Sequence, residues 1–362
     1  MALETIRSGP ERCTGEQATN PMSPPRRITS FDIAERAGVS QPTVSRALRG
    51  SRAVSEETRK RIEAIARQLN YKVDKNASNL RSRHSNTLAL LFFEEAAPDD
   101  SQINPFFLTM LGSITRACAL RGYDLLISFQ QLSNDWHTDY EDSRKADGII
   151  LLGYGDYETY REKLVQLVAQ GTHFVLWGSS RDGQPGVTIG SDNFQGGLSA
   201  CRHLIERGRR RIGFLGSASS HYPEFFARYR GYQAALAAAG LSADPALQAD
   251  ALSSEEDGEA AARALLAGEK AFDALVCASD LIAIGAMRTL QAAGLQVPGD
   301  VAIVGYDNIP AARFTRPPLS SVAQDSRAAA ALLVDALIHQ IMGEPVADAV
   351  LPVSLEVRES SG

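Results

Sequence analysis

The side chains best suited to contact another molecule lie in one short run, Ser40 to Arg49. An arginine can donate two hydrogen bonds to guanine O6 and N7, and a glutamine can pair with adenine N6 and N7. Arg46 and Gln41 therefore offer recognition of bases in the major groove of DNA. With Thr29, which precedes the run, the predicted DNA-contacting residues here are Ser40, Gln41, Pro42, Thr43, Ser45, Arg46 and Arg49.

Two short helices that meet at a glycine would position these side chains. Ser30 is placed to cap a helix over Phe31 to Ala37, and Ser40 to cap a second over Gln41 to Leu48. Gly38, between them, reaches the positive φ that a residue just past a helix end needs. This pattern predicts a helix-turn-helix whose second helix enters the major groove; the alternative is an ordinary helical hairpin. The inward-facing residues would be Ile33, Ala37, Val39, Val44 and Leu48.

A third helix is expected to close this small core. Ser55 is placed to cap Glu56 to Leu69, with acidic residues in the first turn, at the positive end of the helix dipole. Its apolar side chains recur at helical spacing, so we interpret them as packing residues. They are Ile62, Ile65, Ala66 and Leu69.

The charge distribution supports a nucleic-acid partner for this segment. The whole chain carries a net charge of −6, but residues 26–83 hold 14 Lys and Arg against 6 Asp and Glu, a net +8. The remainder therefore carries −14. A basic head on an acidic body concentrates the attraction for phosphates where the reading helix lies.

Composition sets the broad class of protein. The chain has 362 residues, of which 44% are hydrophobic, and this length predicts two or three domains. It shows neither a run of 18 apolar residues nor a signal region, so we expect a cytoplasmic protein. The four cysteines lack metal-ligand spacing, which favours reduced thiols and no metal site. The sequence also lacks the common catalytic and phosphate-binding motifs, so we predict binding rather than an enzyme, without a cofactor.

From Thr87 onward, short apolar runs alternate with longer helical stretches. Continuous hydrophobicity in a strand indicates that both faces of its sheet are covered, as in parallel α/β sheets. About eight such repeats are too many for one compact sheet. The expected strands are Leu88 to Phe93, Tyr123 to Ser128, Gly148 to Leu152, Phe174 to Trp177, Arg211 to Leu215, Ala274 to Cys277 and Val301 to Gly305, with helices such as Phe106 to Arg121, Phe194 to Arg207 and Asp280 to Ala293.

The run Thr-Ser-Phe-Asp-Ile-Ala-Glu-Arg-Ala-Gly-Val-Ser-Gln-Pro-Thr-Val-Ser-Arg-Ala-Leu resembles the DNA-binding head of the lactose/galactose-repressor (LacI) family of bacterial transcription regulators. The resemblance covers nearly everything from Ile28 to Arg358. It implies an all-α helix-turn-helix head and an α/β periplasmic-binding-protein-like core of two parallel-sheet lobes. The lobes would be joined by strands that cross near Ile189 and Val322, with a small molecule in the cleft between them.

The family resemblance also assigns a hinge after the head. Asn76 to Arg81 matches a segment that forms a helix when two copies meet in the minor groove. By that resemblance Leu80 is an apolar wedge between base steps, and Ala77 and Arg81 lie along the groove. Val73 and Asp74 stand where the family commonly has Pro and Asn, a departure that affects the expected rigidity of the hinge.

For the cleft, the resemblance assigns effector-binding residues. Arg228 would be the main polar anchor, Asp307 ends a strand facing the cleft, and Ser279 stands where lactose-type repressors carry Asn. An arginine and an aspartate can bracket vicinal hydroxyls while an aromatic ring packs on sugar C–H groups, which favours a sugar. Purine-binding relatives use the same ring positions, so a nucleobase stays open. The remaining predicted effector contacts are Phe106, Phe107, Trp177 and Gln324.

Four segments are therefore expected: a disordered extension (1–27), the head (28–71), the hinge (72–86) and the two-lobed effector and dimerisation domain (87–362). Because no leucine heptad tail follows the last strand, Leu351 to Arg358, we expect a homodimer on a pseudo-palindromic operator. The predicted function is a repressor controlled by a sugar. The rival is a cytoplasmic sugar or nucleoside sensor without an operator, which the basic head argues against.

Overall fold

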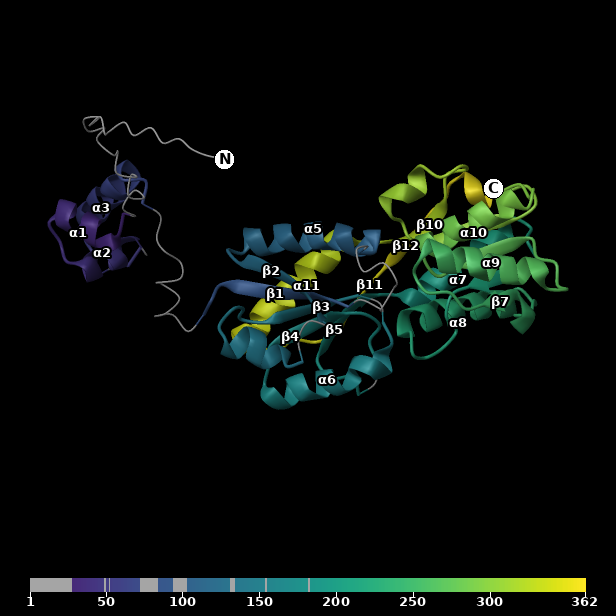
Figure 1. Ribbon diagram of the computed structural model, residues 1–362, viewed down its shortest axis with the longest axis horizontal. Helices are drawn as coiled ribbons and strands as arrows, with labels where there is room; N and C mark the ends of the chain where they lie inside the picture. Colours follow the sequence, from purple (N-terminus) through teal and green to yellow (C-terminus); the bar gives the residue numbers. More distant parts are fainter. Residues whose placement is uncertain are drawn as a thin grey trace, which may run out of the picture. The chain divides into compact units, whose positions relative to one another are not determined.

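The computed structural model describes residues 28–48, 50–51, 53–71, 84–93, 103–130, 134–153, 155–181 and 183–362. They belong to two compact units, Met1–Arg81 and Ser82–Gly362, which we call the head and the core (Figure 1). The expected disordered extension, residues 1–27, lies outside the described residues, as do residues 72–83 of the expected hinge.

The head consists of three helices around a small apolar centre, as the sequence predicts. They are α1 (Ser30–Ala37), α2 (Gln41–Leu48) and α3 (Glu56–Gln68). Ile33, Val44 and Ile62 are fully buried between them. Gly38 follows α1 with φ 63°, so the expected left-handed turn between the first two helices is confirmed.

The expected cap of the first helix is wrong by one residue. Helix α1 already includes Ser30, and Thr29 precedes it with extended backbone. The Asp32 carboxylate accepts hydrogen bonds from the N–H and from the hydroxyl of Thr29, both at 2.7 Å. The Ser30 hydroxyl instead accepts a bond from Gln41 Nε2 at 3.1 Å, which ties α1 to α2. The cap of α3 is confirmed, because Ser55 Oγ accepts from the Thr58 N–H.

The core contains two six-stranded sheets, one for each lobe (Figure 1). Both are parallel except for β12, which runs antiparallel to β10. Lobe 1 has the order β11-β5-β4-β3-β1-β2 and lobe 2 the order β12-β10-β9-β8-β6-β7. The strands are β1 (Thr87–Phe92), β2 (Asp124–Phe129), β3 (Ile149–Leu152), β4 (Phe174–Trp177), β5 (Val187–Ser191), β6 (Ile212–Leu215), β7 (Gln248–Ala249), β8 (Ala274–Cys277), β9 (Ala302–Asp307), β10 (Ser320–Gln324), β11 (Ala349–Leu351) and β12 (Val353–Glu356).

Helices cover both faces of each sheet, which explains the continuous hydrophobic runs of the strands. In lobe 1, α5 and α11 pack together on one face and α6 lies on the other. In lobe 2, α7 pairs with α8 and α9 pairs with α10. The core helices are α5 (Pro105–Leu120), α6 (Tyr157–Gln170), α7 (Asn193–Glu206), α8 (Pro223–Ala238), α9 (Glu255–Ala267), α10 (Asp280–Ala292) and α11 (Ser326–Ile341).

The chain passes between the lobes at the two predicted places and at one more. It leaves lobe 1 after β5 and returns after β10, as expected. The single last strand expected over Leu351 to Arg358 is wrong. Two short strands replace it, β11 in lobe 1 and β12 in lobe 2, on either side of Pro352. Proline has no N–H to donate to a strand ladder, which makes Pro352 a natural break.

Close packing between α7 and α8 fixes the position of the residues that α8 carries. A Cβ atom on Gly197 would lie 2.0 Å from the carbonyl oxygen of Arg228, and one on Gly231 would lie 2.0 Å from that of Phe194. The two helices therefore approach backbone to backbone. This contact sets the depth at which Arg228 enters the lobe.

Candidate nucleic-acid interface and effector cavity

The outer face of α2 carries the predicted base-reading side chains. Arg46 and Pro42 are exposed, and so is Ser40, which precedes the helix. Gln41, Thr43 and Ser45 are half-buried, and the hydroxyls of Ser40 and Thr43 lie 2.9 Å apart. Val44 and Ala47 point into the head and are buried. The helix thus separates an inner packing face from an outer polar face, as a reading helix requires.

Several predicted DNA contacts cannot be placed in the same way. Arg49, Ala77, Leu80 and Arg81 lie outside the described residues. Thr29 is exposed, but its hydroxyl is engaged with Asp32 at the start of α1. Its role in DNA contact therefore stays a prediction.

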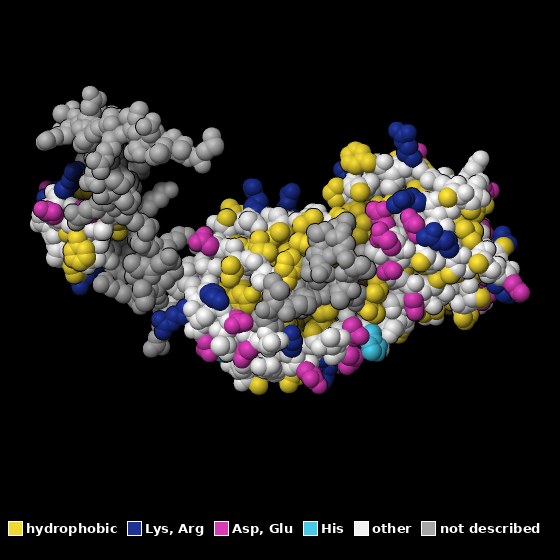
Figure 2. Space-filling view, viewed as in Figure 1, with side chains coloured by type: hydrophobic (Ala, Val, Ile, Leu, Met, Phe, Trp, Pro, Cys, Tyr) yellow, Lys and Arg dark blue, Asp and Glu magenta, His cyan; other side chains and the backbone are white. Residues whose placement is uncertain are grey.

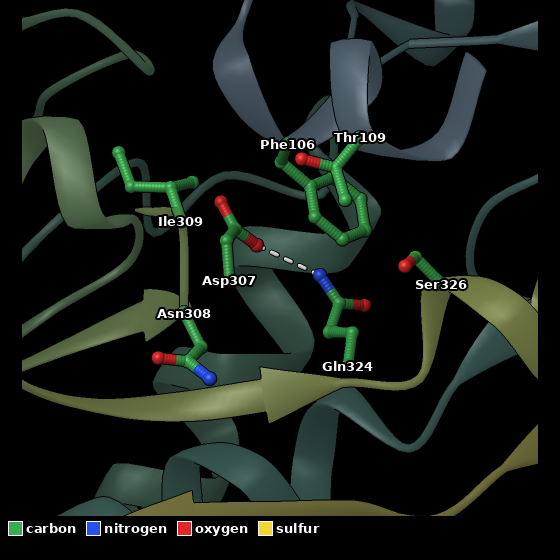
Figure 3. A pocket seen from close by; sticks show the side chains of 7 residues that line it. All are labelled: Phe106, Thr109, Asp307, Asn308, Ile309, Gln324 and Ser326. Carbon is green, nitrogen blue, oxygen red and sulfur yellow. Dashed lines mark hydrogen bonds between the residues drawn. The ribbon is translucent and has the colours of Figure 1, made fainter. Parts of the chain in front are cut away.

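A cavity of about 180 Å³ lies between the two lobes of the core (Figure 3). The N-terminal half of α5 contributes one wall, and the ends of β9 and β10 contribute the other. The described residues that line it are Phe106, Thr109, Asp307, Asn308, Ile309, Gln324 and Ser326. Three of the predicted effector residues, Phe106, Asp307 and Gln324, are thus brought together around one cavity, Phe106 in one wall and the other two in the opposite wall.

The polar centre of this cavity is held in a specific geometry. Gln324 Nε2 donates a hydrogen bond of 2.7 Å to Asp307 Oδ1, so the ends of β9 and β10 are joined (Figure 3). Asp307 has φ 100° and Asn308 has φ 49°. Few non-glycine residues adopt a positive φ, and those that do cluster at functional sites. The turn after β9 therefore presents the Asp307 carboxylate at a backbone cost.

Arg228 lies behind Asp307 as a buried cation. Its side chain is 1% exposed, and Nη1 lies 3.8 Å from Asp307 Oδ1. Nε donates to Asn193 Oδ1 at 2.8 Å, and Nη1 donates to the Ala278 carbonyl. The guanidinium also stacks 3.7 Å above the centre of the Tyr306 ring. These contacts hold the guanidinium in place, with its positive charge opposite the carboxylate of Asp307.

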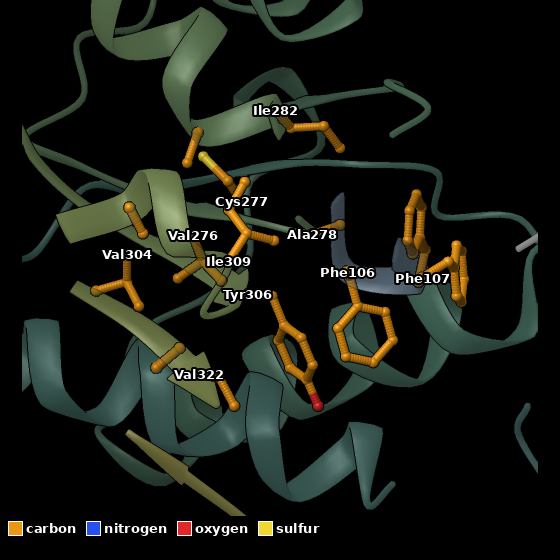
Figure 4. Close-up of a cluster of buried hydrophobic side chains, with 14 of the residues drawn as sticks. Phe106, Phe107, Val276, Cys277, Ala278, Ile282, Val304, Tyr306, Ile309 and Val322 are labelled. Carbon is orange, nitrogen blue, oxygen red and sulfur yellow. The ribbon is translucent and has the colours of Figure 1, made fainter. Parts of the chain in front are cut away.

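The other predicted effector residues lie nearby but do not line this cavity among the described residues. Ser279 is fully buried and caps α10, where its hydroxyl accepts from the Ile282 N–H at 3.3 Å. Phe107 and Trp177 are buried beside Phe106, with ring centres 5.3 Å and 6.2 Å away. Phe106 points toward Tyr306, while Phe107 lies farther from it (Figure 4).

Three buried polar residues in the region around Arg228 and the cavity were not predicted as part of the site. They are Asn193, Asp280 and Glu224. Asn193 orients Arg228, and Asp280 accepts from Ser321 Oγ at 2.6 Å and from the Ile309 N–H at 2.8 Å. Burial raises the pKa of Asp280 well above its usual range. Glu224 was detectable from spacing, because it lies four residues before Arg228 and so shares its helix face.

Polar contacts connect the two lobes across the cleft. His221 Nδ1 of lobe 2 lies 3.0 Å from the carboxylate of Asp156 in lobe 1. Asn104 Nδ2 donates to Ser253 Oγ at 2.9 Å. The Ser179 N–H donates to Glu224 Oε1 at 2.8 Å. The structure therefore represents an arrangement in which the lobes touch.

The described residues contain no group of three or more His, Cys, Asp or Glu side chains that could hold a metal ion. In the part of the chain that the structure describes, no helix is both long and apolar enough to cross a membrane.

A helix-turn-helix head joined to a two-lobed core with a polar cavity defines the class of ligand-responsive DNA-binding proteins. Residues 31–74 match the model of bacterial regulatory proteins of the lacI family, and residues 201–361 match the periplasmic binding protein-like domain. The chain belongs to the LacI family and is a DNA-binding transcription regulator, as the sequence predicted.

Named relatives and solved structures agree with this assignment. The ribose operon repressor of Escherichia coli K12 is 30% identical, over 86% of this chain and 93% of the relative. The transcriptional regulator CelR of Thermobifida fusca is 31% identical, over 92% and 98%. The structure of a CelR–cellobiose complex matches with a TM-score of 0.68 and 31% identity, over 92% of this chain and all of that one. The operator-bound lac repressor dimer shares the fold, with a TM-score of 0.78 at 24% identity over 93% and 99%.

Proposed function

We propose that the chain is a cytoplasmic repressor that releases a pseudo-palindromic operator when a sugar binds between the lobes of its core. The observation that carries the proposal is the cavity itself, where a buried carboxylate, an amide and an aromatic ring converge. Carboxylates and amides accept hydrogen bonds from hydroxyls, and a ring packs on the C–H face of a sugar. Relatives support this ligand class, since one matched structure contains cellobiose.

The proposed roles follow the segments expected from the sequence. Residues 28–71 read DNA, residues 72–86 form the hinge, and residues 87–362 bind the effector and the second subunit. Arg46, Gln41 and their neighbours on α2 contact bases. Arg228, Asp307 and Gln324 hold the sugar, with Ser279 and the aromatic residues supporting the wall. A sugar that prefers one arrangement of the lobes shifts the population and changes operator affinity by the ratio of its two affinities.

An exposed apolar surface on lobe 1 supports the homodimer. Leu108 and Leu120 of α5 are 47% and 75% exposed, and Ile127 of β2 is 47% exposed. Figure 2 shows apolar side chains gathered over this region. A contiguous exposed apolar patch favours a protein partner, and a second copy would give the two heads that a palindrome requires.

Selection of bound sequences from a random duplex pool tests the DNA half. The expected result is enrichment of one palindrome, and Arg46→Ala should relax the preference at one base position of that palindrome. Recovery of sequences no different from the input pool would refute operator recognition. The sugar effector is tested by titrating the purified chain with ribose and with cellobiose and measuring the shift in its melting temperature. The same titration with guanine tests the alternative that the effector is a nucleobase.

A further inference from the structure

We propose that Ser30 positions the side-chain amide of Gln41 and so restricts it to adenine or cytosine, the bases that present an amino group in the major groove. The inference rests on the proposed function, in which Gln41 contacts a base. It goes further by assigning a positioning role to a residue of the first helix and a base preference to the pair.

Ser30 and Gln41 join the two helices of the helix-turn-helix. Ser30 begins α1, and Gln41 begins α2 eleven residues later. Gln41 Nε2 donates a hydrogen bond of 3.1 Å to Ser30 Oγ, and both residues are half-buried. In helix-turn-helix proteins the N-terminal residues of the second helix contact base edges. The contact with Ser30 therefore holds Gln41 at the end of α2 that faces DNA.

The first turn of α2 is ordered without DNA. The hydroxyls of Ser40 and Thr43 lie 2.9 Å apart, and the ring of Pro42 fixes its own φ. The hydrogen bond to Ser30 adds the long side chain of Gln41 to this ordered turn. Immobilising a flexible side chain only in the complex weakens binding by roughly 2- to 10-fold, a cost that the contact with Ser30 removes.

The same hydrogen bond decides which end of the amide is left for DNA. A glutamine amide has an acceptor oxygen and a donor nitrogen. Because Nε2 is engaged with Ser30, and no described residue donates to Gln41 Oε1, the oxygen is the end left for a base edge. Adenine N6 and cytosine N4 donate in the major groove, whereas guanine O6 and N7 and thymine O4 accept. Without Ser30, the amide can turn its nitrogen outward and donate to guanine or thymine as well.

Selection from a random duplex pool with the full-length chain tests the proposal. In the wild type, one position of each half-site should favour adenine or cytosine, and Gln41→Ala should lose that preference. Ser30→Ala should relax the same position, so that guanine or thymine is also recovered there. On the selected palindrome, fluorescence anisotropy should show binding roughly 2- to 10-fold weaker for each half-site. The preference that Arg46→Ala relaxes should persist in Ser30→Ala, whereas a folding defect of the head would weaken every position.

Three further variants separate positioning from folding. Ser30→Thr keeps the hydroxyl and should keep both the preference and the affinity. Ser51→Ala makes the same chemical change elsewhere in the head, where the Ser51 hydroxyl accepts the Ala53 N–H at 3.3 Å, and should change neither. In the Gln41→Ala background, Ser30→Ala should have no further effect at that base position, because the two residues act as one unit.

The outcomes distinguish this inference from operator recognition. An unchanged preference in Ser30→Ala at the position that Gln41→Ala relaxes would overturn the proposal while operator recognition stood. So would a wild-type preference for guanine or thymine at that position, or a Gln41→Ala variant that keeps every base preference. Recovery of no palindrome by the wild type would instead refute operator recognition, and this inference with it.

Discussion

Replacing Arg228 by methionine should destabilise the core and remove its response to sugar. Methionine fills much of the same volume, but it removes the hydrogen bonds to Asn193 and Ala278 and the cation beside Asp307. Hydrogen bonds of a charged group contribute about 1.5 to 3 kcal/mol each. Breaking a buried ion pair by removing one partner costs about 3 to 5 kcal/mol, because the other charge stays buried. We expect a loss of about 3 to 5 kcal/mol in the free energy of unfolding.

The assay is urea unfolding of the full-length chain, followed by circular dichroism. Arg230→Met is the matched control, because Arg230 lies two residues further along α8 and is exposed. Such a surface change should stay within about 0.5 kcal/mol of the wild type. A loss below about 1 kcal/mol in Arg228→Met would refute the reasoning, since it would show that the buried contacts of this arginine contribute little.

Three further predictions follow from other parts of the molecule. Arg46→Ala should weaken binding to the selected operator by about 1 to 3 kcal/mol and relax one base preference, measured by fluorescence anisotropy; an equal loss on random DNA would show a phosphate contact instead. Gly197→Ala should lower the melting temperature, because the added Cβ would lie 2.0 Å from the carbonyl oxygen of Arg228. The control is Gly112→Ala in α5, whose Cβ would meet nothing within 4 Å and which should leave the melting temperature unchanged or slightly higher. Equal melting temperatures for the two variants would show that α7 and α8 can separate at no cost. Burial raises the pKa of Glu224 above 4.5, so above that pH the folded wild type retains a proton that the unfolded chain releases. The free energy of unfolding of the wild type therefore falls as the pH rises through the raised pKa. Glu224→Gln lacks this effect and should gain stability relative to the wild type as the pH rises above 4.5 in urea titrations; a constant difference would contradict the raised pKa.

The sequence predicted most of the framework because that framework depends on local signals. The glycine at position 38 and the spacing of Ile33 and Val44 require only neighbouring residues to be read. The strands were visible as apolar runs because both sheet faces are covered. The residue that caps α1 was misassigned by one position, because Thr29 and Ser30 are both good capping residues. Only the position of Asp32, which accepts the Thr29 N–H, decides between them.

The cavity was harder to predict because its parts meet only after folding. Asp307 and Gln324 come from the ends of two neighbouring strands, and Phe106 comes from the other lobe. Asn193 orients Arg228 across 35 residues of sequence, which no local pattern reveals. The break at Pro352 was missed because its two short strands read as one, although proline marks the place where they part.

Operator affinity measured with and without sugar tests the central claim most directly. A labelled duplex carrying the selected palindrome is titrated with the full-length chain at fixed ionic strength, in the presence and absence of a sugar that the chain binds. A repressor controlled through the interlobe cavity should bind the operator at least about tenfold more weakly with the sugar, and Arg228→Met should abolish the difference. An affinity that the bound sugar leaves unchanged would contradict the account.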